Sequence, residues 1–163
     1  MEIDEIVNRF EFYAQHHVDI AHIPGDVKKR AFLHIDQEEL QTAVKQNLTF
    51  PALLLQTPTA EKAGVYDNMT EDWSFTFVII QPLTASLTKT KIISQCKKLT
   101  DEILKMLMLD VQLEIVPSVV QGTSEGIVGP LTDKIYGWGV SISLGDAFDA
   151  AIDPAKWSYK PGM

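Results

Sequence analysis

The stretch that most constrains the fold is residues 134–144, Lys-Ile-Tyr-Gly-Trp-Gly-Val-Ser-Ile-Ser-Leu. Glycine or serine separates each large side chain of this run from the next, and the large residues are Tyr136, Trp138, Val140, Ile142 and Leu144. A period of two places alternate side chains on opposite faces of a β-strand. We therefore expect a strand whose large face is buried and whose small face lets a helix or another backbone approach closely.

Further segments have the length and composition of strands. In residues 73–81, apolar and polar side chains alternate at first, and the following positions are apolar in succession. Pro82 ends the run. Residues 31–35 and 50–56 are shorter apolar segments. Each of the three is predicted to be a strand.

Three segments between these elements are assigned by their composition. Residues 111–120 read as a strand that Pro117 interrupts, which favours a sheet edge or a bulge there. Residues 57–72 are polar and contain proline, glycine and asparagine, which predicts an exposed loop of the long kind that is often functional or mobile. Residues 122–129 hold three glycines and predict a turn or a β-hairpin arm before strand 134–144.

Apolar residues spaced by three and four positions predict the helices. Residues 2–17 have such a stripe, with acidic residues in the first turn. Residues 36–47 begin with an aspartate followed by a glutamate three positions later, as in a capping box. A long helix begins at Thr88 or Thr90 and ends near Met108, with the stripe of a helix that lies on a sheet.

Together these segments predict a single α+β domain over residues 1–163. Its two layers are a mostly antiparallel sheet and, packed on it, the N-terminal helix and the long central helix. A chain of 163 residues buries about two-thirds of its unfolded surface, which is enough for one core. Residues 150–163 lack periodicity and predict an irregular tail, with Phe148 or Trp157 packed onto the body.

The charge and hydropathy of the chain exclude some functions. The net charge of −8 repels a phosphate backbone, so sequence-specific nucleic-acid binding is not expected. No apolar run approaches the roughly 20 residues that cross a bilayer, so no membrane partner is expected. The first five residues are acidic where a secretory signal is basic, which predicts synthesis and folding in a cytoplasm.

Ser124 lies in the sequence Gly122-Thr-Ser-Glu-Gly126, which matches the G-x-S-x-G pattern of hydrolases. In those enzymes the serine sits on a sharp turn between a strand and a helix, and the histidine follows later in the chain. Here no helix pattern follows, and all four histidines lie at or before position 34. A flexible glycine-rich turn is therefore favoured, although a different fold could still assemble a triad.

The histidines near the end of the first helix are the clustered candidates for metal binding. His16 and His17 are adjacent and point about 100° apart on a helix, so they do not share a face. A zinc site would require His22 and a carboxylate, Asp19 or Asp26, to fold back. Solvated or helix-capping histidines are favoured, and no metal is expected.

Other reactive side chains have simpler interpretations. The carboxylate pairs Glu71–Asp72 and Asp149/Asp153 fall in predicted loops, where solvated acids are the default. Cys96 lies on the apolar stripe of the long helix and is expected to be an inert packing residue. No phosphate-binding loop, dinucleotide fingerprint or calcium loop occurs in the sequence, so no cofactor is expected.

The order of the elements and a short motif resemble a known family. Asp133-Lys-Ile-Tyr-Gly-Trp138, the alternating strand behind it and the acidic, proline-containing end through Trp157 resemble small head–tail joining and tail-terminator proteins of long-tailed bacteriophages and prophages. Those proteins are similar in having an N-terminal amphipathic helix, a Phe-Pro strand like Phe50–Pro51, an aromatic strand like residues 73–81, a long helix and a final strand opened by Gly-Trp. Residues 18–49 look like an insertion relative to the simplest form of that pattern.

The resemblance implies a structural virion protein and not an enzyme. Such α+β subunits assemble into a homo-oligomeric ring, commonly a hexamer, which caps the tail tube or joins it to the head. The implied partners are further copies of the chain and tail-tube or neck proteins, with DNA only as passing cargo in an acidic lumen. The implied location is the tail or neck of a virion assembled in the cytoplasm of a bacterial host.

Predicted loops supply the contact residues of this hypothesis. They are selected as apolar or charged groups on those loops: Val65, Tyr66, Asp67, Asn68, Met69, Glu125 and Ile127. Two alternatives stay open. One is a non-enzymatic adaptor or immunity-type protein whose acidic surface meets a basic partner. The other is a small-molecule-binding or hydrolytic domain that uses Ser124 with a histidine from the first 34 residues.

Overall fold

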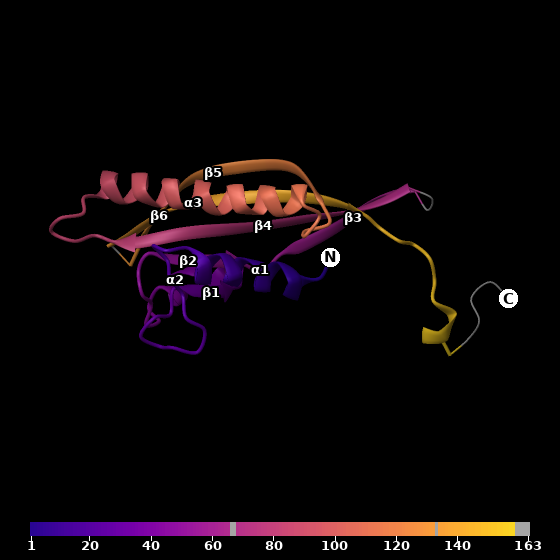
Figure 1. Cartoon of the computed structure of the whole chain (residues 1–163), viewed down its shortest axis with the longest axis horizontal. Coiled ribbons are helices and arrows are strands. Elements are labelled where there is room, and N and C mark those ends of the chain that lie inside the picture. Colours follow the sequence, from indigo (N-terminus) through magenta and orange to yellow (C-terminus); the bar gives the residue numbers. More distant parts are fainter. Residues whose placement is uncertain (66–67, 133, 159–163) are drawn as a thin grey trace.

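The computed structural model describes residues 1–65, 68–132 and 134–158 and consists of one six-stranded sheet with helices packed on it (Figure 1). The strand order is β1-β2-β4-β6-β5, and β3 pairs with β4 outside this path. The strands are β1 (Phe32–Ile35), β2 (Ala52–Gln56), β3 (Thr59–Val65), β4 (Asn68–Pro82), β5 (Val119–Leu131) and β6 (Ile135–Ala147). The pair β1–β2 is parallel and the other pairs are antiparallel, so the predicted α+β class with a mostly antiparallel sheet is confirmed.

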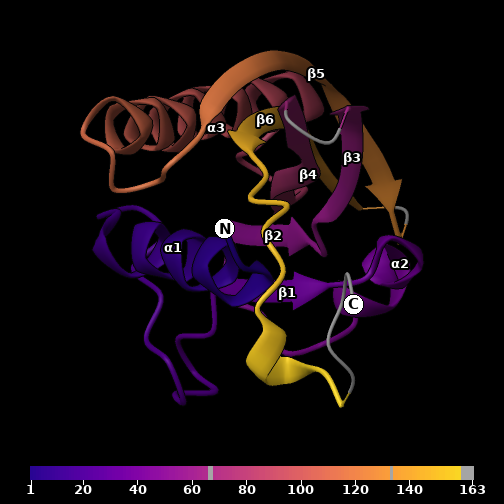
Figure 2. The same ribbon diagram turned by 90° about the vertical axis from the view of Figure 1, so that its right-hand side faces the viewer.

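The two long helices pack on the same face of the sheet. They are α1 (Ile3–His16) and α3 (Lys89–Gln112), and the short α2 (Leu40–Ala43) lies on the opposite face (Figure 2). One core cluster joins the buried stripes of α1 and α3 to the large side chains of β2, β4 and β6. A second, smaller cluster lies under α2 and joins it to β1, β2, the other face of β4 and the ends of β5 and β6.

The helices begin where side chains satisfy the free backbone groups of the first turn. Glu2 and Glu5 form a capping box at the start of α1, and Thr88 accepts a hydrogen bond from the Lys91 amide at the start of α3. The predicted start at Thr88 is therefore correct. The helix continues past the predicted end near Met108, because Asp110 lies on its buried side and finds polar partners on α1.

The predicted central strand is β6, which pairs with β4 on one side and with β5 on the other. Of its five large residues, Val140, Ile142 and Leu144 are at most 1% exposed and face the two long helices, as predicted. Tyr136 and Trp138 were predicted to be buried as well, and they are half-buried. The small residues admit the neighbouring strand and not a helix: a Cβ added at Gly137 would lie 2.1 Å from the carbonyl oxygen of Ile79. Ser141, on this small face, is exposed.

Several predicted boundaries are wrong. Residues 59–65 and 68–72, which were predicted to belong to a loop, form an antiparallel ribbon of β3 and the first part of β4. All seven residues of β3 are exposed, so the ribbon lacks the alternation that marks a strand with one buried face. Residues 111–120 are mostly the end of α3 and a connection, and β5 begins only at Val119. Residues 36–47 form the 3₁₀-helix η1 (Gln37–Glu39) followed by the single turn of α2.

Residues 122–129 belong to β5, so the hairpin-arm interpretation of this segment is correct. Beyond β6 the chain is irregular except for the 3₁₀-helix η2 (Pro154–Lys156), and side chains 151–158 are exposed. The half-buried Phe148 lies over β3, with the Lys62 Nζ 4.2 Å from the centre of its ring.

Candidate functional site

The margin of the sheet at β5 is the most extensive backbone surface that lacks a partner in the part of the chain that the structure describes. β5 pairs with β6 along its inner side, and it stands last in the strand order. Its register shifts between Val120 and Gly122 and again between Val128 and Leu131. Between these irregularities residues 122–128 form a continuous strand segment, which we call the β5 edge.

Soluble proteins block edge-to-edge pairing with lysine, proline, β-bulges and inward-pointing charges, and the β5 edge has the last two: a register shift at each end and Glu125. It contains no lysine and no proline, and Glu125 is its one charged residue. The carboxylate of Glu125 accepts hydrogen bonds from Trp138 Nε1 at 2.8 Å and Lys97 Nζ at 3.4 Å, so it is held toward α3. Ile127 on the same strand is 58% exposed. Between its two register shifts, the outer side of the β5 edge has no strand partner within the described residues.

Several exposed apolar side chains precede the β5 edge in the chain. Large apolar side chains that are 41% to 68% exposed follow one another from the end of α3 into β5: Met106, Met108, Leu109, Leu113, Ile115 and Val119. Such side chains can contribute to a protein–protein contact where they gather into one patch. The β5 edge and this segment thus combine unpaired backbone with apolar side chains.

The ribbon of β3 and β4 carries three of the other predicted contact residues, Val65, Asn68 and Met69. Figure 1 shows that it reaches beyond the end of α3. Val65 at its outer end is 73% exposed, Asn68 is exposed and Met69 is half-buried. Tyr66 and Asp67 lie outside the described residues. The predicted contact residues that the structure describes therefore lie on two separate elements, the ribbon and the β5 edge.

Ser124 does not sit on a strand-to-helix turn, since it lies within β5 opposite Ser141 of β6. It borders a shallow depression of about 480 Å³ on the sheet face away from α1 and α3. Hydroxyl groups of four strands and of the β2–β3 connection dominate its lining. Among the residues that the structure describes, no histidine lines the depression.

His34 lies near this depression but does not face Ser124. Its Nε2 lies 3.1 Å from the Thr57 hydroxyl, which itself donates to Asp36 at 2.6 Å. Because Thr57 donates its proton to Asp36, its oxygen accepts from the His34 ring. This arrangement differs from a nucleophile–histidine–carboxylate chain, in which the histidine stands between the other two groups.

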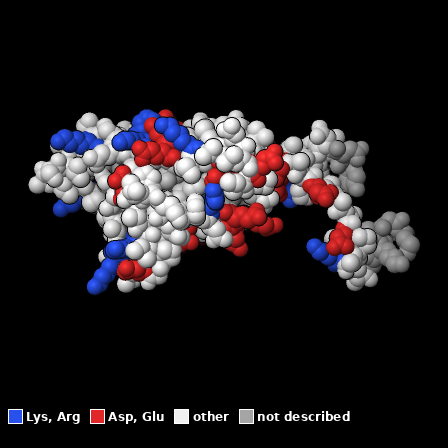
Figure 3. Space-filling view, in the orientation of Figure 1, with Lys and Arg blue, Asp and Glu red and all other residues white. Residues whose placement is uncertain are grey.

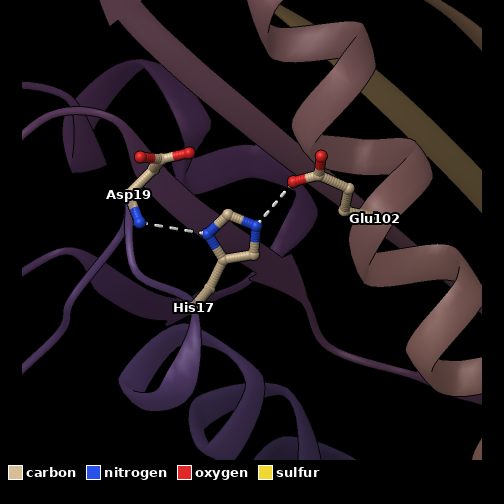
Figure 4. Close-up of side chains that lie close together, drawn as sticks. All are labelled: His17, Asp19 and Glu102. Carbon is tan, nitrogen blue, oxygen red and sulfur yellow. Dashed lines mark hydrogen bonds and ion pairs between the residues drawn. The ribbon is translucent and has the colours of Figure 1, made fainter.

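The two adjacent histidines at the end of α1 have different environments. His17 caps the helix, its Nε2 lies 2.8 Å from Glu102 Oε2, and its Nδ1 accepts from the Asp19 amide at 3.2 Å (Figure 4). His16 stacks on Phe12 with ring centres 4.1 Å apart and is exposed.

His22 is buried instead of turning back toward His16 and His17. Its Nδ1 accepts from the Ala31 amide at 3.1 Å. The carboxylate beside His17 belongs to Glu102, which the sequence did not indicate. It lies 85 positions away along the chain, and only the packing of α1 beside α3 brings it there.

A buried carboxylate joins α1 to α3. Asp110 is 2% exposed and accepts hydrogen bonds from Arg9 Nε at 2.5 Å and from the Tyr13 hydroxyl. Burial alone opposes ionisation of Asp110, but the bonds from Arg9 and Tyr13 outweigh it and lower the pKa of this carboxyl. Burial, together with the bond to Asp110, raises the pKa of Tyr13. We interpret this network as a structural connection between the helices.

The charged groups do not form a continuous basic surface on the face that carries α1 and α3. Figure 3 shows acidic groups gathered over the middle of this face, basic groups mainly toward one end, and uncharged surface between them. The pattern agrees with the excess of 22 acidic over 14 basic residues and gives a nucleic-acid backbone little to bind.

No family model matches the chain, and no curated protein sequence matches it. Within the described residues, no helix has both the length and the apolar character that crossing a membrane requires.

Proposed function

We propose that the protein is a structural virion subunit of the tail-terminator or head–tail joining kind, which assembles into a homo-oligomeric ring. The β5 edge is the observation that carries the proposal of self-assembly, because an unpaired strand of this length is a template for another strand. The assignment to a phage tail or neck rests on the resemblance of Asp133–Trp138 and of the order of elements.

The two margins of the sheet differ, and this difference supports a ring. One margin is the 13-residue β5, and the other consists of the four-residue β1 and the seven-residue β3. A contact between unlike surfaces is head-to-tail, and such contacts close into a ring when the rotation between neighbours allows it. The apolar segment between Met106 and Val119 lies beside the β5 edge in the chain and adds contact area.

The net charge and the ribbon of β3 and β4 support the partners that we propose. A net charge of −8 keeps DNA from adhering, as a lumen through which DNA only passes requires. The ribbon of β3 and β4, with Val65 exposed near its outer end, is the element we assign to contacts with a tail-tube or neck protein.

Sedimentation velocity over a range of roughly 1 to 200 µM protein tests self-assembly, because mass action favours the oligomer at high concentration. The expected result is a single oligomer that grows at the expense of monomer. Ile127→Lys places a charge on the β5 edge, and we expect it to weaken association about ten-fold or more. Val27→Lys is the matched control: Val27 is 65% exposed and lies outside the β5 edge, so association should be unchanged.

Two results would count against the proposal. A chain that stays monomeric throughout the range does not self-assemble through an open edge. Equal effects of the two lysine variants would remove the β5 edge from the interface. A pull-down from the native lysate separates the alternatives, since tail-tube or neck proteins are expected here and an unrelated basic partner is expected for an adaptor protein.

A further inference from the structure

We propose that His17, Asp19 and Glu102 form a surface site for a divalent transition-metal ion, with Zn²⁺ the best fit. One ligand atom from each of the three residues can be chosen so that all lie within 4.8 Å of one another (Figure 4). The site is separate from the β5 edge, and it does not depend on the proposed virion role.

The separation of the three residues suits a metal ion after small side-chain rotations. Zn–N and Zn–O bonds of about 2.0–2.1 Å in a tetrahedral arrangement place neighbouring ligand atoms about 3.3 Å apart. The His17 Nε2–Glu102 Oε2 distance of 2.8 Å has to widen slightly, and the Asp19 carboxylate has to move inward. Figure 4 shows the Asp19 and Glu102 carboxylates both directed toward the space beside the imidazole ring.

The backbone holds two of the ligands in place. His17 ends α1, and its carbonyl accepts from the amides of Ile20 and Ala21 in a tight turn that contains Asp19. The side chain of His17 is 15% exposed, so its ring is largely enclosed. Glu102 lies within α3, which extends more than two turns to either side of it. The ring and the glutamate therefore come from ordered elements that the core packs together.

The charges around the site favour a cation. The ion pairs of the described residues give neither Asp19 nor Glu102 a lysine or arginine partner. Two carboxylates that lack such a partner can neutralise a divalent ion. An imidazole with carboxylates is a ligand set that suits Zn²⁺ better than Mg²⁺ or Ca²⁺, which prefer oxygen ligands alone. With His17, Glu102 and the exposed Asp19 as ligands, the fourth coordination position of the ion is open to water.

Metal binding changes the position of one proton. Because Nδ1 of His17 accepts from the Asp19 amide, its ring proton is assigned to Nε2, directed at Glu102. Coordination through Nε2 requires this proton to leave, and the neutral ring then carries its proton on Nδ1. The 3.2 Å bond from the Asp19 amide is lost in exchange for the metal bond. Without a metal, the same residues form a simple histidine–glutamate pair, and the experiment must separate these two cases.

Isothermal titration of the full chain with ZnCl₂, after treatment with a chelator, provides the test. We expect one ion per chain with a Kd of about 1–10 µM, and a higher Tm in the presence of Zn²⁺. His17→Gln and Glu102→Gln keep side-chain size and polarity, and each should weaken binding at least about ten-fold. His16→Ala is the matched control: it removes the neighbouring histidine, which is turned to Phe12, and should change the Kd less than about two-fold.

A spectroscopic measurement makes the result independent of folding defects. Co²⁺ in place of Zn²⁺ should give visible absorption bands of a four-coordinate site in the wild type and in His16→Ala, but not in Glu102→Gln. Circular dichroism checks that each variant folds. The proposal is overturned if the wild type takes up no Zn²⁺ at these concentrations, or if His16→Ala loses binding while Glu102→Gln retains it.

Discussion

Replacing Asp110 with asparagine tests how α1 is attached to α3. The Asp110 carboxylate is 2% exposed and accepts from Arg9 and Tyr13. A hydrogen bond to a charged group contributes about 1.5–3 kcal/mol, and breaking a buried ion pair costs about 3–5 kcal/mol. Asparagine keeps the shape and one acceptor oxygen, and the Arg9 side chain is 24% exposed, so water compensates part of the loss. We expect the free energy of unfolding to fall by about 2–3 kcal/mol.

Urea unfolding followed by circular dichroism, at a protein concentration where the chain is monomeric, measures this change. Asp101→Asn is the control on the same helix: Asp101 is 40% exposed and pairs with Lys97 at i,i+4, so its loss should cost less than about 0.5 kcal/mol. A cost for Asp110→Asn no larger than that of Asp101→Asn would refute the assignment of Asp110 as a stabilising connection.

The stability difference between the wild type and Asp110→Asn should depend on pH. The folded-state pKa of Asp110 lies below that of a carboxyl in the unfolded chain, so its ionised form stabilises the protein above the unfolded pKa of about 3.9. That contribution is lost as the pH falls through the folded-state pKa. The difference between wild type and Asp110→Asn should therefore be largest near neutral pH and shrink in acid. A difference that stays constant down to about pH 2.5 would contradict this reasoning.

Two further predictions concern the centre of the fold. A Cβ at Gly137 would lie 2.1 Å from the Ile79 carbonyl oxygen, whereas a Cβ at Gly126 meets no atom within 4 Å. Gly137→Ala should lower the free energy of unfolding by about 1–3 kcal/mol or prevent folding, while Gly126→Ala should be tolerated; equal urea midpoints would contradict the packing. Burial of Cys96 raises the pKa of its thiol to about 12, so iodoacetamide at pH 8 should alkylate it only after unfolding. Rapid alkylation of the native protein would show that this helix face opens.

The predictable parts of the fold are those with one buried face. The alternation in residues 134–144 and 73–81 and the stripes of α1 and α3 each give a period that the sequence displays directly. β3 was missed because water surrounds both of its faces, which removes the need for apolar residues at alternate positions. Its place is determined by pairing with β4, a contact that local sequence does not encode.

The residues of the candidate sites depend on distant contacts in the same way. Nothing in the sequence marks Asp110 as a buried residue, and its burial is possible because Arg9 and Tyr13 lie opposite it. The sequence marks His17 as one of the clustered candidates for metal binding. Its partner Glu102, however, lies on a helix 85 positions away along the chain. By contrast, Cys96 lies on the apolar stripe itself and was correctly predicted to be a buried packing residue.

Hydrogen exchange of the backbone amides of the β5 edge, residues 122–128, shows whether this strand pairs between subunits when it is measured below and above the concentration at which the chain associates. Amides on the outer side of this strand lack a partner in the single chain and gain one if a neighbouring strand pairs there. We expect these amides to exchange more slowly in the oligomer, while those of β1 and α2 change less. Unchanged exchange along residues 122–128 in an assembled ring would contradict this expectation.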